Sequence, residues 1–388
     1  MGIALISMTV LFPCSTPYTA METVPVSVAE ESVSDSEEEI VNLSEAKWET
    51  TVYGESAPAD TDTGEGENTG IDIRYLLFLQ EFRRSINDAW TPFMEFVSTF
   101  ATRYLILAVM FIYWAVNKRS GLYTIAAMCL TLGINQLVKL TACVYRPWIR
   151  DPRIVPAGDA ITSATGYSFP SGHTATAAPL FGGMAVTSDK KHRWFPVLCV
   201  LGTLLIAFSR NYLGVHTPQD VFVAICESVL CLIIMSRLFA YIENNPENED
   251  RFLLAGILLG FISIAYITFK PYPMTYVDGK LLVDPQKMMN DGYGDICLLI
   301  AFPVARYIEK TWVRFRSAGL NSIGILTGVV GLIPMFFMIV YMRHALDGML
   351  GSHWGHFSFS FIIVLYSVAV YPLVIRMMTE RREKAAGN

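Results

Sequence analysis

The sequence predicts an all-α fold, a bundle of helices that crosses a membrane several times. Hydrophobic residues make up 53% of the 388 residues and charged residues only 16%, whereas soluble domains carry about 25% charged residues. The mean hydropathy is +0.40. Apolar runs close to the length that a bilayer requires, about 20 residues in a helix, recur along the chain. Together these observations indicate a polytopic membrane helical bundle.

The first 72 residues are expected to lie outside this bundle. Residues 1–20 form an apolar stretch too short to span a bilayer, and we interpret them as a signal peptide. Residues 22–70 hold 14 Asp or Glu and one Lys, a net charge of −13, although the whole chain carries −6. Such a segment buries too little apolar surface to offset its chain entropy. We therefore predict an acidic, disordered, extracytoplasmic segment over 21–72; an acidic tail that binds cations or a basic partner is the alternative.

Helices are expected from residue 73 onward. Residues 73–95 are amphipathic and suit either a helix that lies on the bilayer surface or an ordinary helix packed against the bundle. Nine membrane spans are predicted near residues 99–116, 122–141, 172–187, 195–209, 219–240, 252–270, 293–308, 318–342 and 357–376. The seventh has the weakest pattern, because it is short and contains Pro303.

Basic residues in alternate loops orient the bundle. They concentrate in five segments, at 118–119, 190–193, 237–251, 310–316 and 376–384. By the positive-inside rule these segments and the C-terminus face the cytoplasm of a cell-membrane protein. The intervening loops then face outward, at 139–170, 210–220, 270–295 and 344–356. Loop 139–153 is an exception, because it is expected to face outward and yet carries several basic residues. Two of these, Arg150 and Arg153, are interpreted as cations that snorkel to the interface.

Three short polar blocks lie in the loops expected to face outward, and they are Lys139–Pro147, Pro170–His173 and Ser209–Asp220. Phosphoryl transfer needs fixed donors around the phosphate oxygens, a nucleophile in line and an acid for the leaving group. The blocks contain these groups on one face of the membrane. The candidate site residues are Lys139, Arg146, Ser171, Gly172, His173, Arg210, His216 and Asp220.

Five of these residues are expected to bind phosphate. Lys139 supplies a point charge, and Arg146 and Arg210 supply planar forks that can each grip two oxygens. Ser171 and Gly172 stand just before an apolar helix, so their backbone N–H groups can point at an anion at its N-terminus. With three cations in place, no metal and no cofactor is expected.

The other three residues are expected to carry out the chemistry. His216 is the predicted nucleophile, giving a phosphohistidine that water hydrolyses. Asp220 would hold the opposite ring nitrogen. Residues 217–220, Thr-Pro-Gln-Asp, predict a helix N-terminus with Asp220 in its first turn, so Asp220 is alternatively a capping acid. His173 would protonate the leaving group; the alternative is a core histidine that satisfies a hydrogen bond.

The spacing Lys-x6-Arg-Pro, Pro-Ser-Gly-His and Ser-Arg-x5-His-x3-Asp resembles the signature of the type 2 phosphatidic acid phosphatase (PAP2) superfamily. That family includes lipid phosphatases, bacterial undecaprenyl-diphosphate phosphatases, glucose-6-phosphatase and vanadium haloperoxidases. The resemblance implies a PAP2-type six-helix catalytic domain, which we assign to 73–245, and leaves 246–388 as extra C-terminal transmembrane helices. It also implies a metal-independent phosphatase that acts on a lipid phosphate or diphosphate at the outer leaflet.

Undecaprenyl diphosphate is the favoured substrate, because an outward-facing site matches the side on which that carrier lipid is released. A phosphatidic acid or phosphatidylglycerophosphate phosphatase is an alternative, as is a phosphotransferase that passes the phosphoryl group from the same histidine to a sugar or lipid head group. A transporter or binding protein with a degenerate site is disfavoured, because both His173 and His216 are present. The expected partners are the lipid substrate and the membrane, with no nucleic acid.

Overall fold

The computed structural model describes residues 70–386 except 165, 190 and 278–279. The expected signal peptide and most of the acidic segment lie outside the described residues. Helices make up nearly all of the regular structure, so the all-α prediction is confirmed. The strands of the described residues are a single antiparallel hairpin, β1 (Tyr276–Val277) with β2 (Lys280–Leu281).

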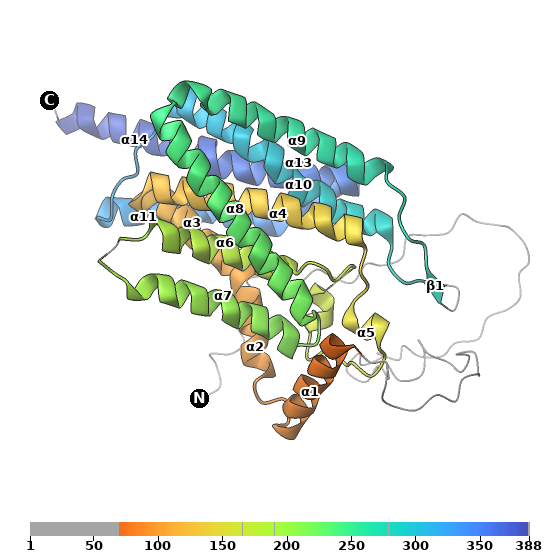
Figure 1. Cartoon of the computed structure of the whole chain (residues 1–388). Coiled ribbons are helices and arrows are strands. Elements are labelled where there is room, and N and C mark those ends of the chain that lie inside the picture. The colour runs from red at the N-terminus through yellow and green to blue at the C-terminus, as the bar shows by residue number, and fades with distance from the viewer. Residues whose placement is uncertain (1–69, 165, 190, 278–279, 387–388) are drawn as a thin grey trace, which may run out of the picture. The chain divides into compact units, whose positions relative to one another are not determined.

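The helices follow one another with short connections (Figure 1). Those of the first half are α1 (Ile71–Ser85), α2 (Thr91–Phe100), α3 (Ile106–Phe111), α4 (Lys118–Ala142), α5 (Pro147–Arg150), α6 (Gly172–Thr187), α7 (Trp194–Tyr212) and α8 (Pro218–Asn244). Those of the second half are α9 (Glu249–Phe269), α10 (Pro285–Ile308), α11 (Ser322–Phe337), α12 (Arg343–Leu350), α13 (Ser352–Leu365) and α14 (Tyr371–Ala386).

Wider π-helical and tighter 3₁₀ segments join or extend several of these helices. The π-helical segments are η2 (Ala101–Leu105), η3 (Ile112–Val116), η6 (Glu309–Val313), η7 (Met338–Met342) and η8 (Tyr366–Val370). The 3₁₀ turns are η4 (Ala160–Ser163) and η5 (Pro246–Asn248). Because η2 and η3 continue α2 through α3, residues 91–116 form one helical rod.

Seven helical segments in the described part of the chain are long and apolar enough to cross a membrane. They are Thr91–Val116, Lys118–Arg150, Trp194–Tyr212, Pro218–Asn244, Pro246–Phe269, Ser322–Leu350 and Ser352–Arg381. The chain is therefore a multi-pass membrane protein, although the sequence predicted nine spans. The remaining two are present as the helices α6 and α10. Helix α6 has only 16 residues, and α10 carries charged side chains along its length.

The single amphipathic helix expected at 73–95 is wrong. Helix α1 ends at Ser85, and the chain turns through Asn87 and Asp88, whose φ angles of 50° and 54° are left-handed. Asn and Asp tolerate this region better than most residues. The Asp88 carboxylate also forms an ion pair with Arg83, with Oδ1 2.7 Å from Nε. The turn separates α1 from the membrane-spanning rod that begins at α2.

Helix α1 packs against the bundle with one face and leaves the other uncovered. Leu76 and Ile73 are buried against Ile154 in the loop after α5, whereas Phe78 is 64% exposed. The helix begins at Ile71, two residues before the predicted boundary at residue 73. Asp72 is buried in its first turn. Its carboxylate binds Arg150 at 2.9 Å.

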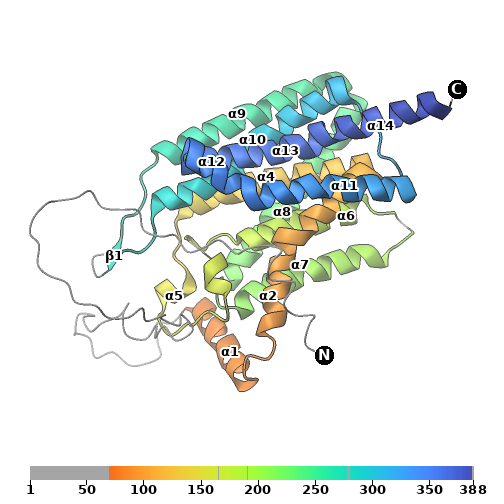
Figure 2. The same ribbon diagram turned by 180° about the vertical axis from the view of Figure 1, so that it is seen from behind.

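Helix α10 lies between the two halves of the chain, beside α4 on one side and α9 and α13 on the others (Figures 1 and 2). Glycines allow the close approach to α4. A Cβ atom at Gly133 would lie 2.6 Å from Leu299 Cγ, and one at Gly292 would lie 2.7 Å from Leu140 Cδ1. The described residues form one compact unit, and the division at residue 245 stays a prediction.

Candidate active site

The three polar blocks meet at one end of the bundle, where α4 and α7 end and α6 and α8 begin, close to α5 (Figure 1). Helix α7 ends just before His216, and Gly214 makes the turn with a φ of +73°, a conformation that glycine adopts without strain. The Val215 N–H closes this turn on the carbonyl of Arg210 at 3.2 Å. His216 is thereby held between the two helices that carry Arg210 and Asp220.

His216 is 1% exposed and is bound through both ring nitrogens. Its Nδ1 lies 3.1 Å from Asp220 Oδ2, and its Nε2 lies 2.9 Å from Arg146 Nη1. A guanidinium only donates hydrogen bonds, so Nε2 must accept and Nδ1 must carry the proton that is shared with Asp220. The free lone pair of the ring is therefore on Nε2, on the side of the cation.

The surroundings of His216 favour its neutral form. Burial lowers the pKa of His216 well below its ordinary value of 6.5, and the charge of Arg146 acts in the same direction. The hydrogen bond and charge of Asp220 oppose this shift. An uncharged imidazole has the lone pair that a nucleophile requires.

Asp220 both caps helix α8 and holds His216. Thr217 and Asp220 form a capping box with Pro218 in the first turn, so the predicted helix start is confirmed. Oδ2 of Asp220 accepts from the Thr217 N–H at 2.9 Å and from Ser168 Oγ at 2.5 Å, besides His216. The sequence left two roles open for Asp220, capping of α8 and orientation of His216. One oxygen of its carboxylate makes the contacts for both.

The start of α6 differs in one respect from the expectation. Ser171 is the N-cap of α6, and its side chain accepts from the Thr174 N–H. Its own N–H, however, donates to the Asp220 carbonyl at 3.0 Å. The prediction that the Ser171 N–H points at an anion is therefore wrong, because this N–H is already bound to a backbone carbonyl in the first turn of α8. The N–H groups of Gly172 and His173, in the first turn, are the ones positioned to bind an anion.

Two cations of the site come from helices, Lys139 from α4 and Arg210 from α7, and the third, Arg146, is the N-cap residue of α5. Arg210 is 1% exposed; Nη1 donates to Ser98 Oγ at 2.6 Å, while Nε and Nη2 are buried without a partner among the described residues. Lys139 reaches the first residue of α6, because a Cβ atom at Gly172 would lie 3.4 Å from its Nζ. Arg146 donates to the carbonyls of Gly166 and Val215 besides His216. Buried N–H groups without an acceptor are costly unless a ligand satisfies them.

His173 lies in the first turn of α6, within electrostatic range of Arg210, His216, Arg146 and Lys139. Within the described residues, no hydrogen bond joins its ring to another side chain or backbone group. The alternative interpretation was a core histidine that satisfies a hydrogen bond. No such hydrogen bond is present among the described residues, so this alternative is not supported. All eight predicted residues are brought to this end of the bundle.

Three residues of the site were missed by sequence reasoning. Ser168 donates to Asp220, and Asn211 Nδ2 donates to the His216 carbonyl at 2.8 Å. Both stand beside or inside the polar blocks, a signal that was available. Ser98 binds Arg210 from 112 positions away, and no local pattern points to it.

Helix α10 adds carboxylates next to Lys139. Asp295 and Asp291 lie within electrostatic range of Lys139, as does Asp220. Gly292, between them, faces Leu140 on α4, which brings this face of α10 toward the end of α4. Among the described residues, no group of three or more His, Cys, Asp or Glu side chains is arranged to hold a metal ion.

The interpretation of Arg150 and Arg153 as snorkelling cations is wrong. Arg150 binds the Asp72 carboxylate at 2.9 Å, and Arg153 binds Asp151 at 2.7 Å. Each arginine is therefore paired with a carboxylate, Arg150 with one in the first turn of α1 and Arg153 with one in the loop after α5. Arg150 and Arg153 are thus already paired, and the cations available to bind phosphate are Lys139, Arg146 and Arg210.

Comparison with known proteins agrees with this geometry. Residues 120–243 match the family model described as the PAP2 superfamily, and that range holds all eight candidate residues. An undecaprenyl-diphosphatase of Sulfolobus acidocaldarius is 25% identical over 130 residues, which cover 33% of this chain and 60% of the relative. No solved structure matches the chain. Residues 120–243 are therefore similar to the PAP2 superfamily, the family that the three polar blocks resemble.

Proposed function

We propose that this protein is a membrane lipid phosphatase that transfers a phosphoryl group first to His216 and then to water. One observation carries the proposal. His216 is buried, its Nδ1–H donates to Asp220, its Nε2 lone pair faces Arg146, and burial lowers the pKa of the ring well below 6.5. The family match supports phosphatase chemistry, and the membrane spans support a lipid substrate.

In the first step Nε2 of His216 attacks phosphorus, and the bond to the leaving oxygen breaks. The ring becomes positively charged, and the Asp220 carboxylate stabilises that charge through Nδ1–H. Arg146 exchanges its contact with Nε2 for a phosphate oxygen, while the unpartnered N–H groups of Arg210 bind others. A proton from His173 goes to the leaving oxygen, and the negative charge of bound phosphate favours that proton on the ring.

In the second step water attacks the phosphohistidine. His173, now unprotonated, takes a proton from that water, and the P–N bond breaks to restore neutral His216. The products are the dephosphorylated leaving group and inorganic phosphate. All charge neutralisation in this scheme comes from the side chains of Lys139, Arg146 and Arg210, so we propose that the reaction needs no metal.

Undecaprenyl diphosphate is the substrate that we propose, with the lipid monophosphate as the leaving group. The relative named undecaprenyl-diphosphatase supports this choice. The distribution of charge supports a site outside the cytoplasm and a cytoplasmic C-terminus. Lys118 and Arg119 begin α4, whereas Lys139 is in its last turn, so the basic loops gather at the end opposite to the site.

The test is phosphate release by the purified protein in detergent with EDTA present. Undecaprenyl diphosphate and phosphatidic acid are offered side by side, and His216→Ala is compared with wild type. His192→Ala is the matched control, because this exposed histidine lies in the α6–α7 connection away from the site. We expect metal-independent release that His216→Ala abolishes and His192→Ala preserves.

Release that survives in His216→Ala would contradict the proposed nucleophile, and release that requires added metal would contradict the proposed neutralisation. Preference for phosphatidic acid would change the substrate while leaving the chemistry in place. No release from either lipid, with phosphate passed to an added sugar or lipid acceptor, would establish a phosphotransferase instead.

A further inference from the structure

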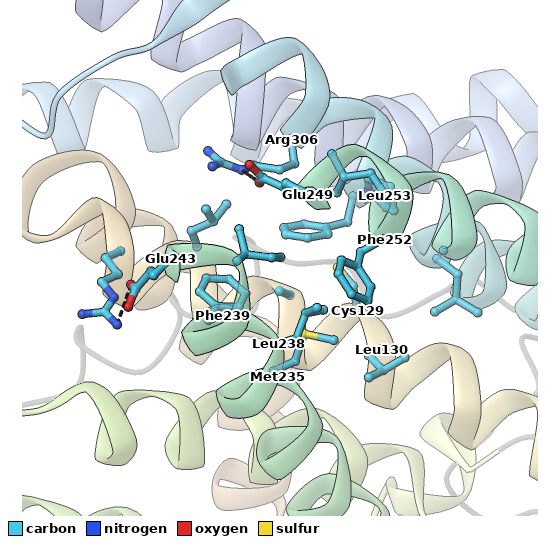
Figure 3. Close-up of a pocket in the computed structure, with 18 of the residues that line it drawn as sticks. Cys129, Leu130, Met235, Leu238, Phe239, Glu243, Glu249, Phe252, Leu253 and Arg306 are labelled. Carbon is cyan, nitrogen blue, oxygen red and sulfur yellow. Dashed lines mark hydrogen bonds and ion pairs between the residues drawn. The ribbon is translucent and has the colours of Figure 1, made fainter. Parts of the chain in front are cut away.

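A second site lies at the end of the bundle away from His216. A cleft of about 410 Å³ opens between α4, α8, α9 and α10, and apolar side chains line most of it (Figure 3). Cys129 comes from α4, Met235 and Phe239 from α8, and Phe252 from α9. The walls therefore combine two helices of the catalytic domain with two of the C-terminal extension.

A cationic pocket of about 500 Å³ adjoins the mouth of this cleft, because Lys118 and Arg306 line both cavities. Its charged lining residues are all basic, and they are Lys118, Arg306, Lys310, Arg314 and Arg316. The cleft is apolar and the adjoining pocket is cationic. A ligand that occupies both therefore needs an apolar part and an anionic part.

Three of the five cations already have acidic partners. Lys118 binds Glu309 at 2.5 Å, Arg306 binds Glu249 at 2.8 Å, and Lys310 binds both Glu249 and Asp250. These ion pairs hold the walls of the pocket in place. Because the three cations are neutralised by carboxylates, they contribute little positive charge to the binding of a ligand.

Arg314 and Arg316 differ from the other three cations. Both are exposed, and neither forms an ion pair with a carboxylate in the described part of the chain. The Nε–H of Arg314 donates to the Lys310 carbonyl at 3.1 Å, which holds its guanidinium at the pocket. Two guanidinium groups without acidic partners suit a phosphate, whose oxygens match their planar forks.

The cleft is separate from the phosphatase site. Lys118 stands at its mouth and Lys139 at the catalytic end of the same helix, 21 positions further along, which corresponds to about 30 Å at the rise of an α-helix. A phosphate held at His216 cannot reach Arg314. The cationic pocket also belongs to the end of the bundle whose basic loops indicate the cytoplasmic leaflet, where anionic lipids attract basic residues.

We propose that the cleft and the cationic pocket together bind an anionic phospholipid of this leaflet. Its phosphate head group contacts Arg314 and Arg316, and one acyl chain fills the cleft between α4, α8, α9 and α10. Charge complementarity selects an anionic head group, and the position of the cationic pocket beside the apolar cleft, where Lys118 and Arg306 line both, selects an amphiphile. Because the walls come from both halves of the chain, the lipid bridges the catalytic domain and the extension.

The experiment measures lipid binding by the full chain in mixed micelles that contain labelled phosphatidylglycerol or labelled phosphatidylcholine. Wild type is compared with the double variant Arg314→Gln/Arg316→Gln. The matched control is Lys191→Gln/Arg193→Gln, which removes the same charge from exposed residues at the same end of the bundle. We expect the first variant to lose about tenfold in affinity for phosphatidylglycerol and the control to keep it.

A second variant tests the cleft itself. Met235→Trp enlarges a side chain that lines the cleft and is expected to weaken the binding of both lipids, because the acyl chain loses its space. Helix content and a monodisperse elution profile establish that each variant is folded. Equal affinity of wild type for the two lipids, unchanged affinity in Arg314→Gln/Arg316→Gln, or full binding in folded Met235→Trp would each overturn the proposal.

Discussion

At the scale of single residues, one carboxylate oxygen connects helix formation with chemistry. Oδ2 of Asp220 accepts from the Thr217 backbone, from Ser168 and from His216. A carboxylate can accept several hydrogen bonds but donates none when ionised. The proton of His216 is therefore held on Nδ1, and the lone pair that attacks phosphorus is fixed on Nε2.

Asp220→Asn tests this assignment. The amide can still accept from the Thr217 N–H, so the cap of α8 and the melting temperature should change little. The amide can also donate to Nδ1, which would place the ring proton on Nε2 and remove the attacking lone pair. We expect kcat to fall at least about a hundredfold. A kcat within a few-fold of wild type would show that Asp220 only caps the helix.

The neutral His216 also determines the pH dependence of the reaction. Because burial lowers the pKa of this imidazole below 6.5, the ring stays unprotonated as the pH falls from about 8 to about 6.5. Because the leaving group also needs a proton from His173, we expect kcat/KM to rise as the pH falls over that interval and to decline only at lower pH, where His216 itself gains a proton. A decline that is already half complete above pH 6.5 would contradict the environment described for His216.

At the scale of elements, local signals were predictable and distant partners were not. The capping sequence before α8 and the start of α6 were read correctly, because capping depends on residues within one turn. The break after α1 was missed, since Asn87 and Asp88 carry only a weak turn signal. The pairs Ser98–Arg210 and Asp72–Arg150 join residues 112 and 78 positions apart, and a local pattern cannot reveal them.

The same limit applies to Ser171. Its place just before an apolar helix was predicted correctly, but its N–H donates to the carbonyl of Asp220 and does not face an anion. That contact depends on how α6 packs against α8. The spacing of the polar blocks in the sequence does not determine this packing. The residue types of the site were thus predictable, whereas the donor that faces the phosphate required the structure.

Helix α10 extends the site with Asp295, whose charge acts on Lys139. This carboxylate competes with phosphate for the cation, so Asp295→Asn is expected to lower the inhibition constant of inorganic phosphate about fivefold. Asp284→Asn is the matched control, because Asp284 caps the start of the same helix. The Asp295→Asn effect should disappear in a Lys139→Ala background. An equal effect in that background would show that Asp295 acts elsewhere.

At the scale of the whole molecule, the C-terminal extension is built into the core of the bundle. Trp114 donates to the Ser367 carbonyl at 2.8 Å, and Tyr113 donates to that of Val368 at 3.2 Å. Tyr371 packs against Trp114 with ring centroids 4.6 Å apart. Buried aromatic residues contribute strongly to such cores, so removing residues 246–388 should leave the remaining residues 70–245 unstable.

Orientation is the prediction that belongs to this scale. An epitope placed at residues 191–193, between α6 and α7, should be reached by antibody only after the membrane is permeabilised. An epitope in the β1–β2 hairpin, on the side of the active site, should be reached in intact cells. The reverse pattern would place the active site in the cytoplasm and would remove the argument for an outward-facing lipid substrate.

The most direct test of the account is to trap the covalent intermediate. Undecaprenyl diphosphate labelled at its terminal phosphorus is mixed with the protein and quenched in alkali, which preserves phosphohistidine, and labelled peptides are mapped. We predict label on His216 in wild type, with no label and no turnover in His216→Ala. Turnover by wild type without label on the chain, or label that remains in His216→Ala, would contradict the phosphohistidine mechanism.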